Sequence, residues 1–293
     1  MTIQLPNKLG VHALVWVGGW SQAECREAIK NTVEAGYDLI EIPALDPSLI
    51  DTAHTLATLK EFGIKAACSM GLSFDADINN EDSEIAAKGE ARLMAALDVV
   101  SEIEGDYLGG VLFSALGKYS HPATLKSRSN SVASLKRLAI AAQAKGITIG
   151  LEPVNRYESN LINTIDQAVE MIKDIGEPNV KVHIDIYHMN IEEQDLASPI
   201  INNAEHIGYV HIGASHRGGL GTGNVDFDQL FGALAKINYK GVITFESFSS
   251  AIVHPDLSLA LAIWRNLWTE NKPMALNARK YMVEHIVRAN NLS

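Results

Sequence analysis

The chain has 293 residues, of which 47% are hydrophobic and 20% charged, and its formal net charge is −11 at pH 7. This length and apolar content allow one sizeable core, so we expect a single domain over residues 1–293. The negative charge argues against a protein that binds nucleic acid, because such binding depends on Lys and Arg at the phosphates. A small-molecule ligand is therefore favoured.

Cysteine content and the first residues bear on where the protein acts. Cys25 and Cys68 are the two cysteines, too few for a disulfide framework. The opening stretch MTIQLPNKLG lacks the charged, apolar and small-residue regions of a signal peptide. The sequence also contains no apolar run of about 18 residues, the length that a membrane span needs. We therefore expect a soluble, cytoplasmic protein with no membrane partner.

Eight short apolar runs have the length and composition of buried strands. They are residues 9–15, 37–42, 64–69, 108–113, 147–152, 180–185, 207–211 and 241–246. Amphipathic stretches separate them. Strand and helix alternating eight times over this length predict an α/β fold, a single (β/α)8 TIM barrel, rather than an open sheet.

Helix-end signals mark several of the connecting segments. Residues 21–36 open on Ser with Glu three positions later, a capping-box pattern, and close on Gly. Similar signals predict helices over 131–146 and 226–241. The segment 114–131 is longer and more polar than its neighbours, which is typical of a loop that reaches over a site.

A potential metal ligand stands at the end of each of the last four predicted strands: Glu152, Asp185, His211 and Glu246. In such barrels the chemistry gathers at the C-terminal strand ends, and neighbouring strands lie about 5 Å apart. One such residue alone is more often a helix N-cap or a solvated side chain. Four in register predict a single divalent metal, and the hard oxygen ligands suit Mn²⁺, Mg²⁺ or Co²⁺.

Further polar residues lie near these strand ends. Glu158, His188 and Arg217 follow the fifth, sixth and seventh predicted strands, although ordinary loop polarity explains each of them equally well. His183 shares the inward parity of the last residue of its strand, and we interpret it as a core histidine that could also support the metal. Glu41, at the end of the second strand, is expected to support the site rather than to bind the metal.

Four motifs, GLEPVNRYES, VHIDIYHMNIEE, HIGASHRGGLGTGNVDF and VITFESF, together resemble the D-tagatose 3-epimerase family. That family includes D-allulose (psicose) and L-ribulose 3-epimerases and belongs to the wider xylose isomerase-like barrels. The resemblance is strongest over residues 147–248. It implies a dimer or tetramer and one divalent metal, commonly Mn²⁺ or Co²⁺, held by the four strand-end residues Glu152, Asp185, His211 and Glu246.

The resemblance also implies substrate contacts. Three loop residues would hold the oxygens at the C1 to C3 end of a ketose: Glu158, His188 and Arg217. Trp20 and Phe248 match apolar pocket positions of the family. His12 stands where an aromatic residue is usual, and Leu116 stands where many members have Trp. Both positions would face the far end of the sugar, so the preferred ketose stays open while the chemistry is unaffected.

Epimerisation at C3 needs a proton removed on one face of the substrate and returned on the other, which requires two acid/base groups. A metal that binds O2 and O3 as a Lewis acid makes the C3 proton removable. Glu152 and Glu246 are the natural pair because they stand on different sides of the metal. Asp185 and His211 would then serve only as ligands.

Three other functions stay open at this point. An aldose–ketose or hydroxypyruvate isomerase would use the same barrel and metal, with one base acting between C1 and C2. An endonuclease IV-like repair enzyme shares the D-x-x-H pattern, but it needs histidines that the third and fourth strands lack, and the acidic charge disfavours it. A sugar-binding protein without activity would not require both glutamates.

Overall fold

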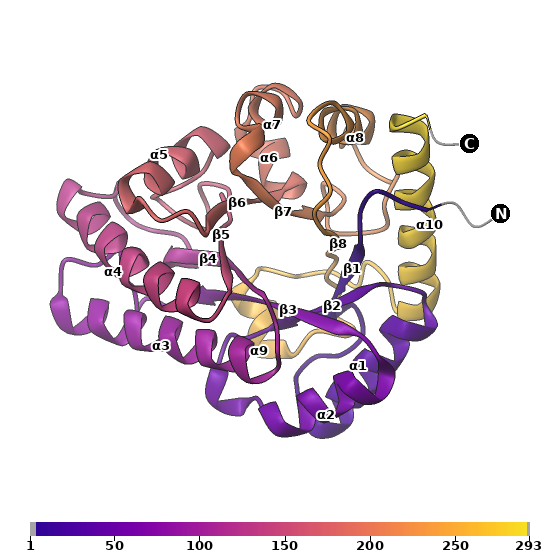
Figure 1. Cartoon of the computed structure of the whole chain (residues 1–293), viewed down its shortest axis with the longest axis horizontal. Helices are drawn as coiled ribbons and strands as arrows, with labels where there is room; N and C mark the ends of the chain where they lie inside the picture. Colours follow the sequence, from indigo (N-terminus) through magenta and orange to yellow (C-terminus); the bar gives the residue numbers. More distant parts are fainter. Residues whose placement is uncertain (1–3, 292–293) are drawn as a thin grey trace.

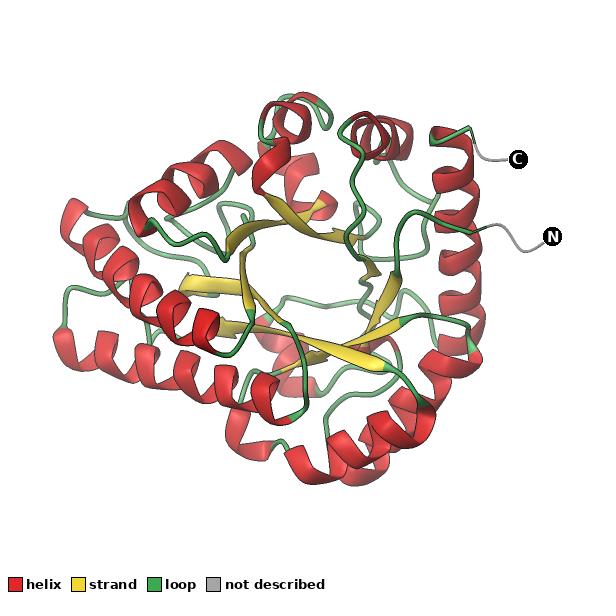
Figure 2. Ribbon diagram, viewed as in Figure 1, coloured by secondary structure: helices red, strands yellow, loops and turns green. Residues whose placement is uncertain are grey.

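The computed structural model describes residues 4–291, and their strands form a closed parallel barrel in the order β1 to β8 (Figure 2). Each strand pairs with its neighbours in sequence, and β8 closes the barrel against β1. The strands are β1 (Leu9–His12), β2 (Leu39–Pro43), β3 (Lys65–Leu72), β4 (Tyr107–Ala115), β5 (Thr148–Leu151), β6 (Val180–Asp185), β7 (Ile207–Ile212) and β8 (Ile243–Phe245). The predicted TIM barrel is confirmed.

Helices surround the barrel on its outside (Figure 1). They are α1 (Gln22–Glu34), α2 (Thr52–Phe62), α3 (Ser83–Glu102), α4 (Leu125–Ala144), α5 (Ile165–Ile175), α6 (Ile186–Glu192), α7 (Ser198–Asn202), α8 (Phe227–Lys236), α9 (Pro255–Ala260) and α10 (Asn271–Ala289). The capping box expected at the start of α1 is present, because Ser21 and Glu24 each bond the backbone N–H of the other. Within residues 4–291, no helix is both long enough and apolar enough to span a bilayer.

The predicted boundary of the first strand was wrong. Strand β1 ends at His12 rather than at residue 15, and the chain turns there into a short 3₁₀ helix over Ala13–Val15. The cause is local, because the His12 Nδ1 atom accepts the backbone N–H of Leu14 at 3.3 Å and caps this turn. The side chain of His12 is thereby fixed at the C-terminal end of the barrel.

Two predicted helix boundaries also differ. Helix α4 begins at Leu125 rather than at residue 131, because Thr124 and Ser127 form a capping box in which each hydroxyl accepts the other's backbone N–H at 3.0 Å. The loop expected over 114–131 is shorter for the same reason. Helix α8 ends at Lys236, before the predicted residue 241.

The chain after β8 covers the C-terminal end of the barrel before it forms the last helix. Figure 1 shows α9 and its flanking loops across the barrel opening, and Leu257 and Leu261 from this segment line the same cavity as Phe248. Helix α10 then runs along the outer wall beside α8. Tyr37, which precedes β2, donates its hydroxyl to the carbonyl of Ala275 in α10 at 2.7 Å. Residues after the last strand therefore form part of the cavity wall.

The barrel interior is tightly packed below the site. Tyr107 stacks on Tyr209 with ring centroids 4.3 Å apart. A Cβ atom added at Gly150 in β5 would lie 1.8 Å from the Tyr107 hydroxyl oxygen. There is no free volume for an added methyl group at this position, because the close-packed side chains of the interior can relax only partly.

We expect Gly150→Ala to destabilise the barrel by about 1–3 kcal/mol, because the added methyl group overpacks the core. Gly232→Ala is the matched control, since a Cβ there meets nothing within 4 Å on the exposed face of α8. That control should be neutral or stabilising by up to about 1 kcal/mol, because Ala favours the helix. Urea denaturation of both variants measures the difference, and an unchanged midpoint for Gly150→Ala would contradict the packing argument.

Candidate metal centre and active site

The structure brings the four predicted ligands to one place at the C-terminal end of the barrel. Glu152 and Glu246 come directly after β5 and β8, Asp185 is the last residue of β6, and His211 lies in β7. All four are buried. The His211 Nδ1 atom lies 3.3 Å from a Glu152 oxygen and 3.6 Å from a Glu246 oxygen. Asp185, His211 and Glu246 each offer a ligand atom within 4.8 Å of the others.

His211 is oriented as a metal ligand would be. Its Nε2 atom contacts both carboxylate oxygens of the buried Glu41, at 2.8 and 2.9 Å. Its Nδ1 atom is buried and makes no hydrogen bond within residues 4–291. A carboxylate on the far nitrogen is the usual partner of a metal-binding histidine, because it fixes the tautomer and the ring orientation. The residues present therefore fit a divalent cation.

Burial and neighbouring charges shift the pKa values of Glu152 and Glu246 in opposite directions. Burial raises the pKa of Glu152 to about 7. Burial also acts to raise the pKa of Glu246, but the Arg217 guanidinium and His211 outweigh it and hold that pKa below its ordinary value. Two carboxyl groups with different proton affinities beside one another are typical of a site that moves protons.

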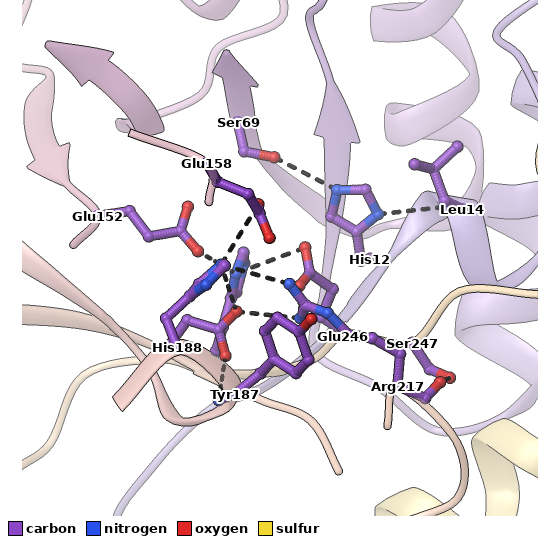
Figure 3. A network of polar contacts seen from close by, with 12 residues as sticks. His12, Leu14, Ser69, Glu152, Glu158, Tyr187, His188, Arg217, Glu246 and Ser247 are labelled. Atoms are coloured by element: carbon purple, nitrogen blue, oxygen red, sulfur yellow. Dashed lines mark hydrogen bonds and ion pairs between the residues drawn. The ribbon is translucent and has the colours of Figure 1, made fainter. Parts of the chain in front are cut away.

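Arg217 is the positive charge that the structure places among these carboxylates (Figure 3). Its Nη1 atom donates to Asp185 Oδ2 at 3.0 Å and to Glu246 Oε2. Its guanidinium also lies 3.8 Å from the centre of the Tyr187 ring. Burial acts to lower the pKa of Arg217, but Glu246 and Asp185 raise it above its ordinary value.

The backbone of Arg217 lies in the left-handed region, with φ of 61°. A non-glycine residue in this region costs about 1–3 kcal/mol and persists only where its surroundings hold it. Ser247 provides such support by donating its hydroxyl to the Arg217 carbonyl at 2.5 Å, and Trp268 donates its indole N–H to Ser247 at 2.8 Å. Arg217 is predictable from its motif, whereas Ser247 and Trp268 are distant in sequence and lie beside it only in the folded chain.

His188 and Glu158 face the same centre and share one support. The His188 Nδ1 atom accepts the backbone N–H of Asn155 at 3.1 Å, so the ring proton lies on Nε2. That Nε2 atom lies 3.5 Å from Asp185 and 4.0 Å from Glu158. Asn155 also donates its side-chain amide to Glu158 at 2.8 Å. Asn155 lies within the motif EPVNRYES, but nothing in its spacing pointed to this role.

A cavity opens above the centre and contains most of the predicted substrate contacts. The cavity is lined by His12, Leu116 and Phe248, together with Glu152, Glu158, His188, His211, Arg217 and Glu246. Trp20 does not line it, because its indole N–H points away to the Thr55 hydroxyl at 3.1 Å. His183 lies below the site, fully buried, with its ring 4.1 Å from that of His211.

A TIM barrel with a buried carboxylate and histidine centre under a cavity defines an enzyme scaffold for small polar substrates. Residues 29–267 match the family model described as xylose isomerase-like TIM barrel. The chain belongs to the xylose isomerase-like TIM barrel family, and the resemblance inferred from the four motifs is confirmed.

Individual relatives agree with this assignment. The chain is 50% identical to an L-ribulose 3-epimerase of Methylomonas sp. (strain DH-1), over 94% of this chain and 98% of the relative. It is 46% identical to a ketose 3-epimerase of Arthrobacter globiformis, over 94% and 95% of the two chains. A crystal structure of the Methylomonas sp. D-allulose 3-epimerase in complex with D-allulose superposes with a TM-score of 0.94 at 48% identity, covering 97% of this chain and 99% of that one.

We expect Glu41→Gln to weaken metal binding about tenfold or more, because the amide keeps the contact with His211 but removes the charge that makes the imidazole a stronger ligand. Calorimetric titration of Mn²⁺ into chelator-treated protein measures this. Glu61→Gln is the control, since Glu61 pairs with Arg26 on the surface far from the cavity. Equal affinities for the wild type and Glu41→Gln would contradict the role given to Glu41.

Proposed function

We propose that this protein is a metal-dependent ketose 3-epimerase that interconverts free ketoses at C3. The observation that carries the proposal is the placement of Glu152 and Glu246, whose carboxylate oxygens approach the His211 Nδ1 atom from the ends of two different strands. The names of the relatives support it, because proteins 42–50% identical to this chain are L-ribulose 3-epimerases and a ketose 3-epimerase.

Glu152, Asp185, His211 and Glu246 would hold the cation, and we propose Mn²⁺ because three carboxylates and one imidazole form a hard ligand set. When bound, the cation supplies Lewis-acid chemistry that lowers the pKa of the substrate C3–H. Glu158 and Arg217, which lie in loops, and His188, which lies in α6, present a carboxylate, a guanidinium and a ring N–H to the cavity. These groups match the hydroxyl and carbonyl oxygens around C1 to C3 of a ketose.

The two glutamates, Glu152 and Glu246, carry out the proton transfers in this proposal. One carboxylate removes the C3 proton from its face of the substrate, and the carbon becomes planar. The other glutamate then delivers a proton to the opposite face, which inverts the configuration. Because the reaction is reversible, the two glutamates exchange roles when the opposite epimer is the substrate.

The cavity favours an unphosphorylated sugar. Among the described residues that line it, none is a lysine, and its one arginine is engaged by Asp185 and Glu246. A phosphate group would meet the three carboxylates of Glu152, Glu158 and Glu246 there without a free cationic partner. We also propose that the protein acts in the cytoplasm as a homodimer or homotetramer, as the family resemblance implies.

Isotope exchange separates epimerisation from the isomerase alternative. The protein is incubated with Mn²⁺ and a panel of free ketoses in D₂O, and NMR follows the position of deuterium. We expect label at C3 together with the C3 epimer. Label at C1 or C2 with an aldose product would instead identify an isomerase, which needs only one base.

Glu152→Gln and Glu246→Gln should each lower epimerisation by at least about 10²-fold, because each removes one of two acid/base groups. Each variant should still form the barrel by circular dichroism and should bind Mn²⁺ more weakly, so rates are compared at saturating metal. The glutamate that remains in each variant can still exchange the C3 proton of one epimer with solvent, without inverting the configuration at C3. Substantial epimerisation by either variant would contradict the two-base assignment.

A further inference from the structure

The charged side chains that line the cavity come from the ends and loops of β5 to β8, whereas the wall formed by β1 to β4 is mostly apolar. Arg217 lies in the loop after β7, so the barrel sheet does not fix it directly. Its guanidinium nevertheless has a defined place, because it donates to Asp185 and Glu246 and lies over the ring of Tyr187. Where this side chain can reach depends on the conformation of the Arg217 backbone.

The Arg217 backbone takes the left-handed conformation that a neighbouring glycine could take at little cost. Gly218 and Gly219 follow it directly, yet neither has a positive φ. The N–H of Arg217 donates to the Ala214 carbonyl at 2.9 Å, within the same loop. Its carbonyl accepts the Ser247 hydroxyl, which comes from outside the loop, after β8 (Figure 3). The two bonds hold the peptide groups on both sides of Arg217 and so fix its dihedral angles.

Ser247 is oriented in turn by a residue of the segment between α9 and α10. The indole N–H of Trp268 donates to the Ser247 oxygen at 2.8 Å. An indole N–H can only donate and a backbone carbonyl can only accept, so the Ser247 proton must point to the Arg217 carbonyl. Trp268 is buried, and its own carbonyl accepts the hydroxyl of Ser249. A chain of hydrogen bonds with one defined direction therefore runs from Trp268 through Ser247 to Arg217.

We propose that Ser247 and Trp268 are positioning residues for the reaction, which hold Arg217 in the conformation that aims its guanidinium at the substrate oxygens. Neither is among the residues that line the cavity, so both act through Arg217. Without the Ser247 hydroxyl, the cost of the left-handed conformation is no longer offset, and the loop relaxes toward an ordinary conformation. Trp268 stands after the last strand, so substrate affinity depends on a segment outside the barrel sheet. This inference rests on the proposed epimerase function.

Ser247→Ala should raise KM for a good ketose about tenfold and change kcat much less, because Arg217 contributes to binding of the substrate and of the transition state alike. Trp268→Phe keeps an aromatic ring but removes the indole N–H. It should raise KM about threefold, since Ser247 retains its own bond to the Arg217 carbonyl. Ser250→Ala is the matched control, because it removes a nearby hydroxyl that donates to Asn266 instead, and it should leave KM unchanged.

A double-mutant cycle separates positioning of Arg217 from general support of the fold. Calorimetry measures the dissociation constant of the ketose for Ser247→Ala alone and in combination with Arg217→Ala. Ser247→Ala should have no effect in the Arg217→Ala background, since no guanidinium is left to be misplaced. An equal loss of affinity in both backgrounds, or no loss in either, would overturn the proposal.

Deuterium entry at C3 of the ketose checks the epimerase function separately in the wild type. Should that exchange fail, a crystal structure of Ser247→Ala tests the positioning role without any substrate. Arg217 should then leave the left-handed region, and its guanidinium should move away from Asp185 and Glu246. An Arg217 that keeps its conformation in this variant would show that Ser247 and Trp268 do not position it.

Discussion

The structure depends on how five carboxylates are held together at one end of the barrel. These are Glu41, Glu152, Glu158, Asp185 and Glu246, and Arg217 is the guanidinium among them. Removing such charges from water is costly unless each is paired. Arg217 binds two of them and His211 bonds a third, so the metal-free centre already has part of the positive charge that it needs. A divalent cation held there would complete this balance, which would explain why an Asp stands at the end of the apolar strand β6.

Much of the site could be predicted from sequence because strand ends converge in a closed barrel. The four candidate ligands follow from the ends of β5 to β8 alone, and no long-range contact had to be known. The same reasoning identified Glu41 as a supporting residue, and the structure places it on the far nitrogen of His211. The barrel itself was predictable because the alternation of apolar runs and helix caps is a local property.

The remaining features depend on contacts between distant segments. The left-handed conformation of Arg217 is stabilised by Ser247 and Trp268, and nothing in the local sequence near Arg217 points to either of them. Trp20 was expected in the cavity by resemblance, but its indole N–H donates to a residue of α2 instead. The early start of α4 was missed because the Thr and Ser of its capping box also suit a polar loop.

The uneven lining of the cavity has a consequence for how such a protein can evolve. The charged groups belong to the second half of the barrel, whereas the first half contributes a mostly apolar wall. Mutations in β1 to β4 can therefore change the shape of the cavity while Glu152 and Glu246, the proposed acid/base groups, stay in place. Glu41 links the two halves, because it contacts His211 and lies 3.8 Å from His12. Substrate range should drift readily in this lineage, and residues in contact with Glu41 should drift least.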